Sequence, residues 1–262
     1  MRRFFMLGAA IAALAAAGCG SSGTSGSSAG SASPSGSASG STITVFAAAS
    51  LQGTFTKLGK QFEAAHPGDK VIFSFGPSSG LATQIINGAP ADVFASAATT
   101  NMTQVVKAGK AASPVDFARN KMEVAVPPSN PGKVSSVDNL SKSSVKVAVC
   151  QPQVPCGVVA HKVFRNASIT VKPVTLEADV KSVLTKVELG DVDAGMVYVT
   201  DVRAAGSKVK GVAIPSSDNA TTTYPIATIS KSSHESTAHA FMEYVLSSQG
   251  QRVLASAGFE KP

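Results

Sequence analysis

Short apolar runs alternate with amphipathic stretches along the chain from about residue 42 onward. The apolar runs have the length of buried strands, which we expect over 43–49, 71–75, 93–96, 122–126, 145–149, 171–174, 194–198, 209–214 and 224–230. Apolar residues at helical spacing predict helices over 51–65, 81–86, 102–107, 157–164, 180–189 and 236–256. This alternation of strands and helices predicts an α/β fold with parallel sheets.

The first residues have a different pattern. A positive start, Arg2-Arg3, precedes an apolar stretch over 4–17 that is too short to span a bilayer comfortably. This stretch ends in small residues before Cys19 and so resembles a bacterial lipoprotein signal, with Ala16 where Leu is usual. We expect residues 1–18 to be a lipoprotein signal peptide and Cys19 to be lipidated and anchored in the cell membrane. The alternative is an ordinary secretory signal.

Residues 20–41 separate this signal from the body of the chain. They contain 11 Ser and 6 Gly, with no charge and no large apolar side chain. Such a segment buries no apolar area and stays a flexible coil. We therefore expect 19–41 to be the lipidated cysteine and its tether, and 42–262 to be a domain outside the cytoplasm.

Composition and charge exclude several classes of protein. Apolar residues make up 44% of the chain and charged residues 15%, which argues against a disordered chain as a whole. The net charge is +7, but no run of Lys or Arg forms a nucleic-acid-binding stripe, so we expect no nucleic-acid partner. Three cysteines are too few for a disulfide scaffold, and the four histidines are scattered. We expect no site for a free metal cation.

Several loops lead from a strand into a helix through small or polar residues. They lie at 49–51, 76–80, 154–157 and 178–180. A helix start presents free backbone N–H groups and a partial positive charge, although a serine there ordinarily just caps the helix. Several helix starts at one cleft would bind an anion without Lys or Arg, and open α/β sheets bind ligands at such strand ends.

The loop at 76–80 also matches the G-x-S-x-G pattern of α/β hydrolases, with a strand before it and a helix after it. Ser78 would then be a nucleophile and would need a downstream histidine: His161, His234 or His239. No lipase-type His-Gly-Gly-Gly run is present. A secreted serine esterase that uses Ser78 is therefore kept as an alternative function.

Cys150 and Cys156 lie six positions apart, at a strand end and a helix start. With Cys19 lipidated, they are the remaining two thiols, and an oxidising compartment favours a disulfide between them. Two free thiols are the alternative. A disulfide would fix the direction of the Cys156 backbone N–H.

An ordered set of motifs resembles the periplasmic molybdate-binding proteins of ABC importers. The matching segments are ITVFAAASL at 43–51, FGPSSGLATQI at 75–85, GAPADVF at 88–94, VPCG at 154–157, ADV at 178–180, GMVY at 195–198 and YP at 224–225. Each motif is weak by itself, but together they cover essentially all of 42–262 in the right order.

This resemblance implies a type II periplasmic-binding-protein fold. Such a fold has two α/β lobes, each a mainly parallel sheet flanked by helices, joined by crossover strands. Lobe one would comprise 42–123 and 215–262, and lobe two would be the inserted segment 124–214. The ligand would lie in the cleft between the lobes.

The resemblance also implies a ligand set. Ser50 and Ser78 would provide hydroxyl and backbone N–H donors, Cys156 and Val180 backbone N–H groups, and Tyr198 its hydroxyl. Cys156 stands where many relatives have Ala, which leaves its side chain free for a disulfide. Because Pro77 and Gly80 alter the second loop, Ser79 is the alternative to Ser78 at that contact.

The implied function is capture of molybdate, and also of tungstate, and its delivery to an ABC permease. Neutral donors and helix ends would satisfy the buried oxyanion, and cavity size would discriminate against smaller sulfate. We expect a monomer that is not an enzyme, has no catalytic residues and uses no cofactor. A binder of sulfate or another tetrahedral oxyanion is the nearest alternative.

Overall fold

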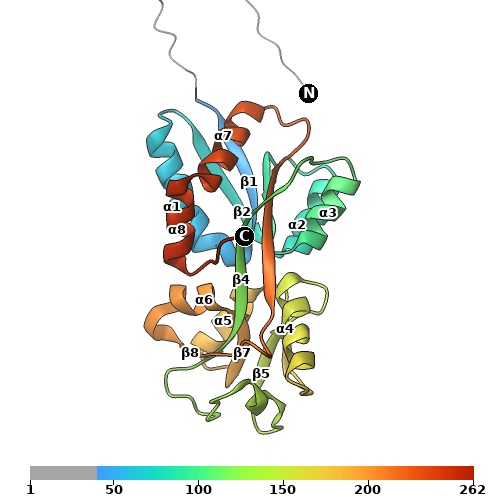
Figure 1. Cartoon of the computed structure of the whole chain (residues 1–262), viewed down its shortest axis with the longest axis vertical. Helices are drawn as coiled ribbons and strands as arrows, with labels where there is room; N and C mark the ends of the chain where they lie inside the picture. The colour runs from blue at the N-terminus through green and yellow to red at the C-terminus, as the bar shows by residue number, and fades with distance from the viewer. Residues whose placement is uncertain (1–39) are drawn as a thin grey trace, which may run out of the picture. The chain divides into compact units, whose positions relative to one another are not determined.

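The structure is a computed structural model, and it describes residues 40–262 (Figure 1). The expected signal peptide (1–18), the lipidation site Cys19 and the tether up to residue 39 lie outside the described residues. Within 40–262, no helix combines the length and apolar character needed to cross a membrane.

The first lobe is built on a sheet with β1 (Thr42–Ala48) near its centre. This strand pairs in parallel with β2 (Lys70–Gly76) and β3 (Val93–Ala95), and β3 pairs antiparallel with β9 (Thr221–Thr228). In Figure 1, α1 and α8 lie on one side of the sheet and α2 and α3 on the other. The helices of this lobe are α1 (Gln52–Ala65), α2 (Ser78–Ile86), α3 (Thr99–Lys107), α7 (Glu235–Leu246) and α8 (Ser248–Ala257).

The second lobe repeats this arrangement. Its strand β5 (Val147–Cys150) pairs in parallel with β6 (Thr175–Glu177) and β7 (Ala194–Tyr198). An antiparallel strand, β4 (Val115–Val126), pairs with β7 and with the short β8 (Lys210–Val212). The helical segments are η2 (Val137–Ser141), α4 (Pro155–Asn166), α5 (Val180–Glu188), α6 (Val199–Ala205) and η3 (Gly206–Lys208).

Two long antiparallel strands, β4 and β9, join the lobes (Figure 1). Along β4, residues 115–121 pair with β9, and from Met122 onward the strand pairs with β7. The buried core changes at the same place: Ala118 packs in the core of the first lobe, and Met122 packs in that of the second. Each lobe therefore has its own apolar core, and the crossover strands connect the two lobes covalently and through hydrogen bonds.

The predicted α/β class is confirmed, and most predicted elements are present within a few residues. The predicted strand over 171–174 is wrong, because β6 begins at Thr175. Pro173 has no N–H to donate to a strand ladder. The single helix predicted over 236–256 is two helices, because Ser247 is extended and its side chain caps α8 by accepting the Gly250 N–H.

Besides the short segments η2 and η3, two longer elements were not predicted from the sequence. The first half of β4, residues 115–121, mixes charged, polar and apolar residues without a clear period and becomes a strand through its pairing with β9. Helix α6 follows β7 directly and contains Val199, Thr200 and Val202, whose branched side chains lower helix propensity. Both elements depend on tertiary contacts more than on local preference.

Candidate functional site: a cavity between the lobes

A small cavity lies between the ends of the two sheets. All five predicted ligand residues line it: Ser50 and Ser78 from the first lobe, and Cys156, Val180 and Tyr198 from the second. Its volume is about 20 Å³, whereas a single water molecule needs about 10–15 Å³. The cavity therefore suits a compact ion and excludes a sugar or a peptide in this conformation. We call it the interlobe cavity.

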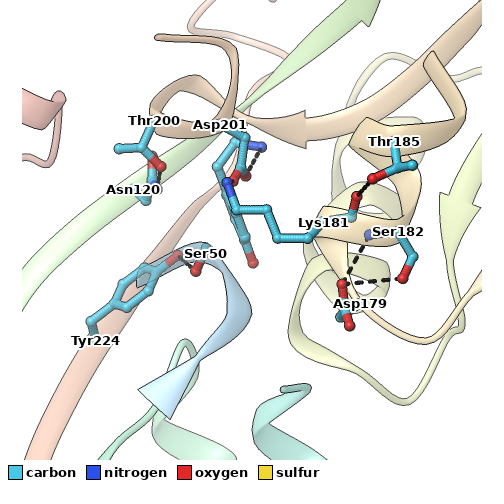
Figure 2. A network of polar contacts seen from close by, with 10 residues as sticks. Ser50, Asn120, Asp179, Lys181, Ser182, Thr185, Thr200, Asp201 and Tyr224 are labelled. Carbon is cyan, nitrogen blue, oxygen red and sulfur yellow. Dashed lines mark hydrogen bonds and ion pairs between the residues drawn. The ribbon is translucent and has the colours of Figure 1, made fainter. Parts of the chain in front are cut away.

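Ser50 lies in η1 (Ala49–Leu51), the turn that follows β1. Its side chain is buried, and its hydroxyl oxygen lies 2.9 Å from the hydroxyl oxygen of Tyr224 on the crossover strand β9. Figure 2 shows this contact beside the second-lobe residues of the site. Ser50 thus lies at the end of β1, and Tyr224, from a distant part of the chain, fixes the orientation of its hydroxyl group.

Ser78 is the first residue of α2. Its hydroxyl accepts the backbone N–H of Ala97 at 2.9 Å, so it is tied to the loop after β3 and does not cap its own helix. Ser78 is buried and lines the cavity, whereas Ser79 is partly exposed and is absent from the lining. The geometry therefore favours Ser78 over Ser79 as the residue that faces a ligand.

The second lobe contributes the start of α4. A disulfide bond joins Cys150 at the end of β5 to Cys156, with an S–S distance of 2.08 Å, and closes the loop between strand and helix. Gly157 is required at the next position, because a Cβ there would overlap the carbonyl group of Gln151. The loop is thus packed tightly over the first turn of α4, whose N-terminus has no side-chain cap among the described residues.

The start of α5 is held by a side-chain cap. Asp179 accepts the backbone N–H of Ser182 at 3.0 Å, so this carboxylate is engaged with its own helix (Figure 2). The cap uses the third N–H group of the helix, and Val180, the first residue of α5, lines the cavity. The Asp179 carboxylate at the cavity is therefore compatible with a bound anion, because its charge is directed to the N-terminus of α5.

Tyr198 ends β7 and is almost completely buried. Its hydroxyl has no hydrogen-bond partner within residues 40–262, although Tyr224 packs nearby with a ring-centroid distance of 6.2 Å. Burial is the main cause that raises the pKa of Tyr198 well above its ordinary value, with further contributions from Tyr224 and Asp201. The phenol is therefore a neutral donor, and an unpaired buried donor at a cavity points to a ligand that it would satisfy.

A buried polar network supports Tyr198 from behind. The carboxylate of Asp201 accepts the backbone N–H of Tyr198 at 3.1 Å and forms an ion pair with Lys181 at 2.8 Å. Nearby, Asn120 on β4 donates to the hydroxyl of Thr200 at 2.8 Å (Figure 2). These residues were not predicted from the sequence, because no local pattern distinguishes them from ordinary surface polar residues.

Positive potential inside the cavity comes from backbone dipoles. No Lys, Arg or His lines it, while the N-termini of α2, α4 and α5 all meet there. Each helix start carries a partial positive charge and free N–H groups. Within 40–262, no group of three His, Cys, Asp or Glu residues is placed to hold a metal cation. Neutral donors in this arrangement can form hydrogen bonds to a small anion.

These features define a class: an α/β protein of two lobes with a small cavity between them, lined by polar groups and helix N-termini. The chain belongs to the bacterial extracellular solute-binding proteins, since the model of that family matches residues 43–260. It is therefore an extracytoplasmic binding protein, and the family resemblance predicted from the ordered motifs is confirmed.

Individual relatives agree with this assignment. The molybdate-binding protein ModA of Mycobacterium tuberculosis is 43% identical over 232 residues, which cover 88% of this chain and 89% of the relative. A putative ABC transporter substrate-binding lipoprotein of Bacillus subtilis, YvgL, is 32% identical over 225 residues, which cover 83% and 86% of the two chains.

A solved structure gives the same fold. The periplasmic molybdate-binding protein of Azotobacter vinelandii matches 84% of this chain and 99% of its own length, with a TM-score of 0.75 and 22% identity. At this level of identity the match supports the two-lobed architecture and leaves the ligand to be argued from the cavity.

Proposed function

We propose that this protein captures molybdate, and also tungstate, in the interlobe cavity and delivers it to an ABC permease. The observation that carries the proposal is the gathering of five hydrogen-bonding positions from both lobes around one cavity that no basic side chain lines. The 43% identity to a mycobacterial molybdate-binding protein over nearly the whole chain supports the same ligand.

The chemistry of the cavity suits a tetrahedral dianion. Its oxygens need several donors at once, and hydroxyl groups, backbone N–H groups and a phenol fixed by the fold supply them. Because the donors are neutral and rigid, the spacing between them sets the ligand size. Molybdate and tungstate have the same charge and shape and nearly the same size, whereas sulfate is smaller. We therefore propose that selectivity against sulfate comes from the size of the closed cavity.

The alternative of a serine esterase has less support. Ser78 accepts the Ala97 N–H, and no histidine is among the residues that line the cavity, so the described part of the chain offers Ser78 no general base there. We propose that the protein is a binding protein without catalytic activity. Hydrolysis of a chromogenic ester by the wild-type protein, lost in Ser78→Ala, would contradict this.

We further propose that the protein is a monomer anchored to the outer face of the cell membrane through a lipid on Cys19. The Ala-Gly-Cys sequence at 17–19 and the similarity to the Bacillus lipoprotein YvgL support the anchor. Expression of the full chain and of Cys19→Ala, followed by detergent phase partitioning, tests it. The wild-type protein should enter the detergent phase, and the variant should remain in the aqueous phase or retain its signal peptide.

A thermal-shift panel tests the ligand. Purified protein is heated with molybdate, tungstate, sulfate or phosphate at equal concentrations. A ligand at about one hundred times its Kd stabilises the folded state by about 2.7 kcal/mol, so the preferred anions should raise the melting temperature strongly. Molybdate and tungstate are expected to do so at concentrations where sulfate and phosphate do not. A larger shift with sulfate would instead favour the sulfate-binding alternative.

A further inference from the structure

A buried carboxylate lies behind the interlobe cavity and is not part of the proposed ligand set. Asp201, in the first turn of α6, has no solvent exposure. One of its oxygens accepts the Tyr198 N–H at 3.1 Å, and the other lies 2.8 Å from Lys181 Nζ. A buried acid needs such partners, because an uncompensated charge in the protein interior is strongly unfavourable.

Both members of this ion pair are adjacent to ligand-bearing positions. Lys181 follows Val180 directly in the first turn of α5, and Asp201 lies three residues after Tyr198. The ion pair therefore connects the start of α5 to the turn between β7 and α6. Figure 2 shows the Lys181 side chain extending from α5 toward Asp201.

The sign of the Asp201 charge is unfavourable for the proposed ligand. A carboxylate in contact with the Tyr198 backbone carries a negative charge next to a cavity that would receive a dianion. The charged or titratable groups that face it are Lys181 and Asp179 from α5, Tyr198 from β7 and Tyr224 from β9. Of these, Lys181 is the cation.

We propose that Lys181 is a positioning and charge-compensating residue for the oxyanion cavity, acting through Asp201. Its ammonium group cancels the buried carboxylate, so that Asp201 can fix the Tyr198 backbone without repelling the bound anion. This inference rests on the proposed function and adds a residue pair outside the ligand set. It predicts that removal of Lys181 alone weakens anion binding, whereas removal of both charges does not.

The pH dependence gives this proposal a distinct signature. Burial raises the pKa of Asp201, and Lys181 and the Tyr198 N–H lower it. Loss of Lys181 therefore raises the pKa further. At the higher pH, the Asp201 carboxylate of Lys181→Met is ionised and repels the dianion. As the pH falls, this carboxylate takes up a proton and the repulsion disappears. The affinity of Lys181→Met for molybdate therefore recovers at lower pH. In wild type, Lys181 compensates the charge of the Asp201 carboxylate, so the affinity for molybdate changes little over the same pH range.

Calorimetric titration with molybdate tests the proposal in four proteins: wild type, Lys181→Met, Asp201→Asn and the double variant, from an alkaline pH down to the lowest pH at which all four stay folded. We expect Lys181→Met to bind at least about tenfold more weakly at the alkaline end, with recovery toward acid. The double variant should bind within about threefold of wild type at every pH. Lys186→Met is the matched control, because Lys186 forms an exposed ion pair with Asp191 on the same helix and should leave binding unchanged.

The possible failures can be told apart. If wild type does not bind molybdate, the proposed function is wrong. If wild type binds molybdate and Lys181→Met binds it equally well, the charge-compensating role is wrong. The role is also wrong if Lys181→Met binds more weakly by the same factor at every pH and the added Asp201→Asn change does not restore binding. If Lys181→Met does not fold by circular dichroism, Asp201→Asn decides the question: it should bind at least as tightly as wild type, and a tenfold loss would overturn the proposal.

Discussion

The hydroxyl oxygen of Ser50 lies 2.9 Å from that of Tyr224, although 174 residues separate them in the sequence. Ser50 belongs to the turn after the first strand, and Tyr224 belongs to the last strand, which crosses between the lobes. When Tyr224 donates to Ser50, the Ser50 proton is free to point into the cavity. The crossover strand thus orients a cavity-lining hydroxyl of the first lobe.

The first prediction concerns the two serine hydroxyls. Ser50→Ala and Ser78→Ala should each weaken molybdate binding by about 1–3 kcal/mol, the cost of leaving a charged acceptor without a donor. Calorimetric titration measures this loss directly. Ser79→Ala is the matched control and should bind as wild type does, because Ser79 lies outside the cavity lining. A loss in Ser79→Ala with none in Ser78→Ala would reverse the assignment of the second loop.

Tyr198→Phe should separate stability from binding. The Tyr198 hydroxyl is buried and has no partner among the described residues, so its removal should leave the ligand-free protein as stable as wild type or more stable by up to about 1 kcal/mol. The same change removes a donor from the cavity and should weaken molybdate binding. Denaturant unfolding without ligand and calorimetry with ligand give the two values. Equal losses in both would indicate a purely structural role for the hydroxyl.

The tyrosines should titrate in two groups. Burial raises the pKa of Tyr198 and of Tyr224 well above the ordinary value of about 10. Because the folded state holds these protons more tightly than the unfolded state, their contribution to stability is complete below about pH 10 and is lost as the pH rises above it. Burial also raises the pKa of Tyr244, but this side chain is partly exposed, so we expect Tyr244 to ionise in the folded protein and the other two tyrosines to ionise upon alkaline unfolding.

Tyrosinate absorbance followed together with circular dichroism checks this expectation. One of the three tyrosines should ionise before the fold is lost. Ionisation of all three with an intact circular dichroism spectrum would show that Tyr198 and Tyr224 are accessible to solvent.

The disulfide should stabilise the loop before α4. Cys150 and Cys156 are six residues apart, and closing a loop of this size contributes about 2 kcal/mol to the free energy of unfolding. Reductant should therefore lower the melting temperature of wild type, while Cys150→Ala/Cys156→Ala should begin lower and show no further change. Native protein without reductant should take up no alkylating label at either cysteine, and labelling there would refute the bond.

Two glycines offer a matched pair. In Gly157→Ala the new Cβ would overlap the carbonyl of Gln151, so the loop or the start of α4 must shift, and we expect a loss of about 1–3 kcal/mol in stability. Gly53 lies in α1 with open space around it, and Gly53→Ala should stabilise the helix by up to about 1 kcal/mol. Urea unfolding of both variants measures the difference. Equal effects would mean that the close approach at Gly157 relaxes at little cost.

The local elements were largely predictable from the sequence. Strands such as β1 and β7 are short, mostly apolar runs, and helices such as α1 repeat apolar side chains on one face, so their burial pattern is encoded within the element itself. The helix starts that line the cavity were also visible, because small polar residues follow strand ends there. The order of the motifs along the chain was sufficient to indicate the family.

The tertiary structure alone decided which of these positions meet. Ser50 and Tyr224, or Lys181 and Asp201, share no local pattern, and only the packing of two lobes through β4 and β9 brings each pair into contact. The first half of β4 and helix α6 likewise gain their stability from distant partners. Local preference fixes the conformation of short segments, whereas convergence on one cavity depends on long-range packing that no short stretch of residues encodes.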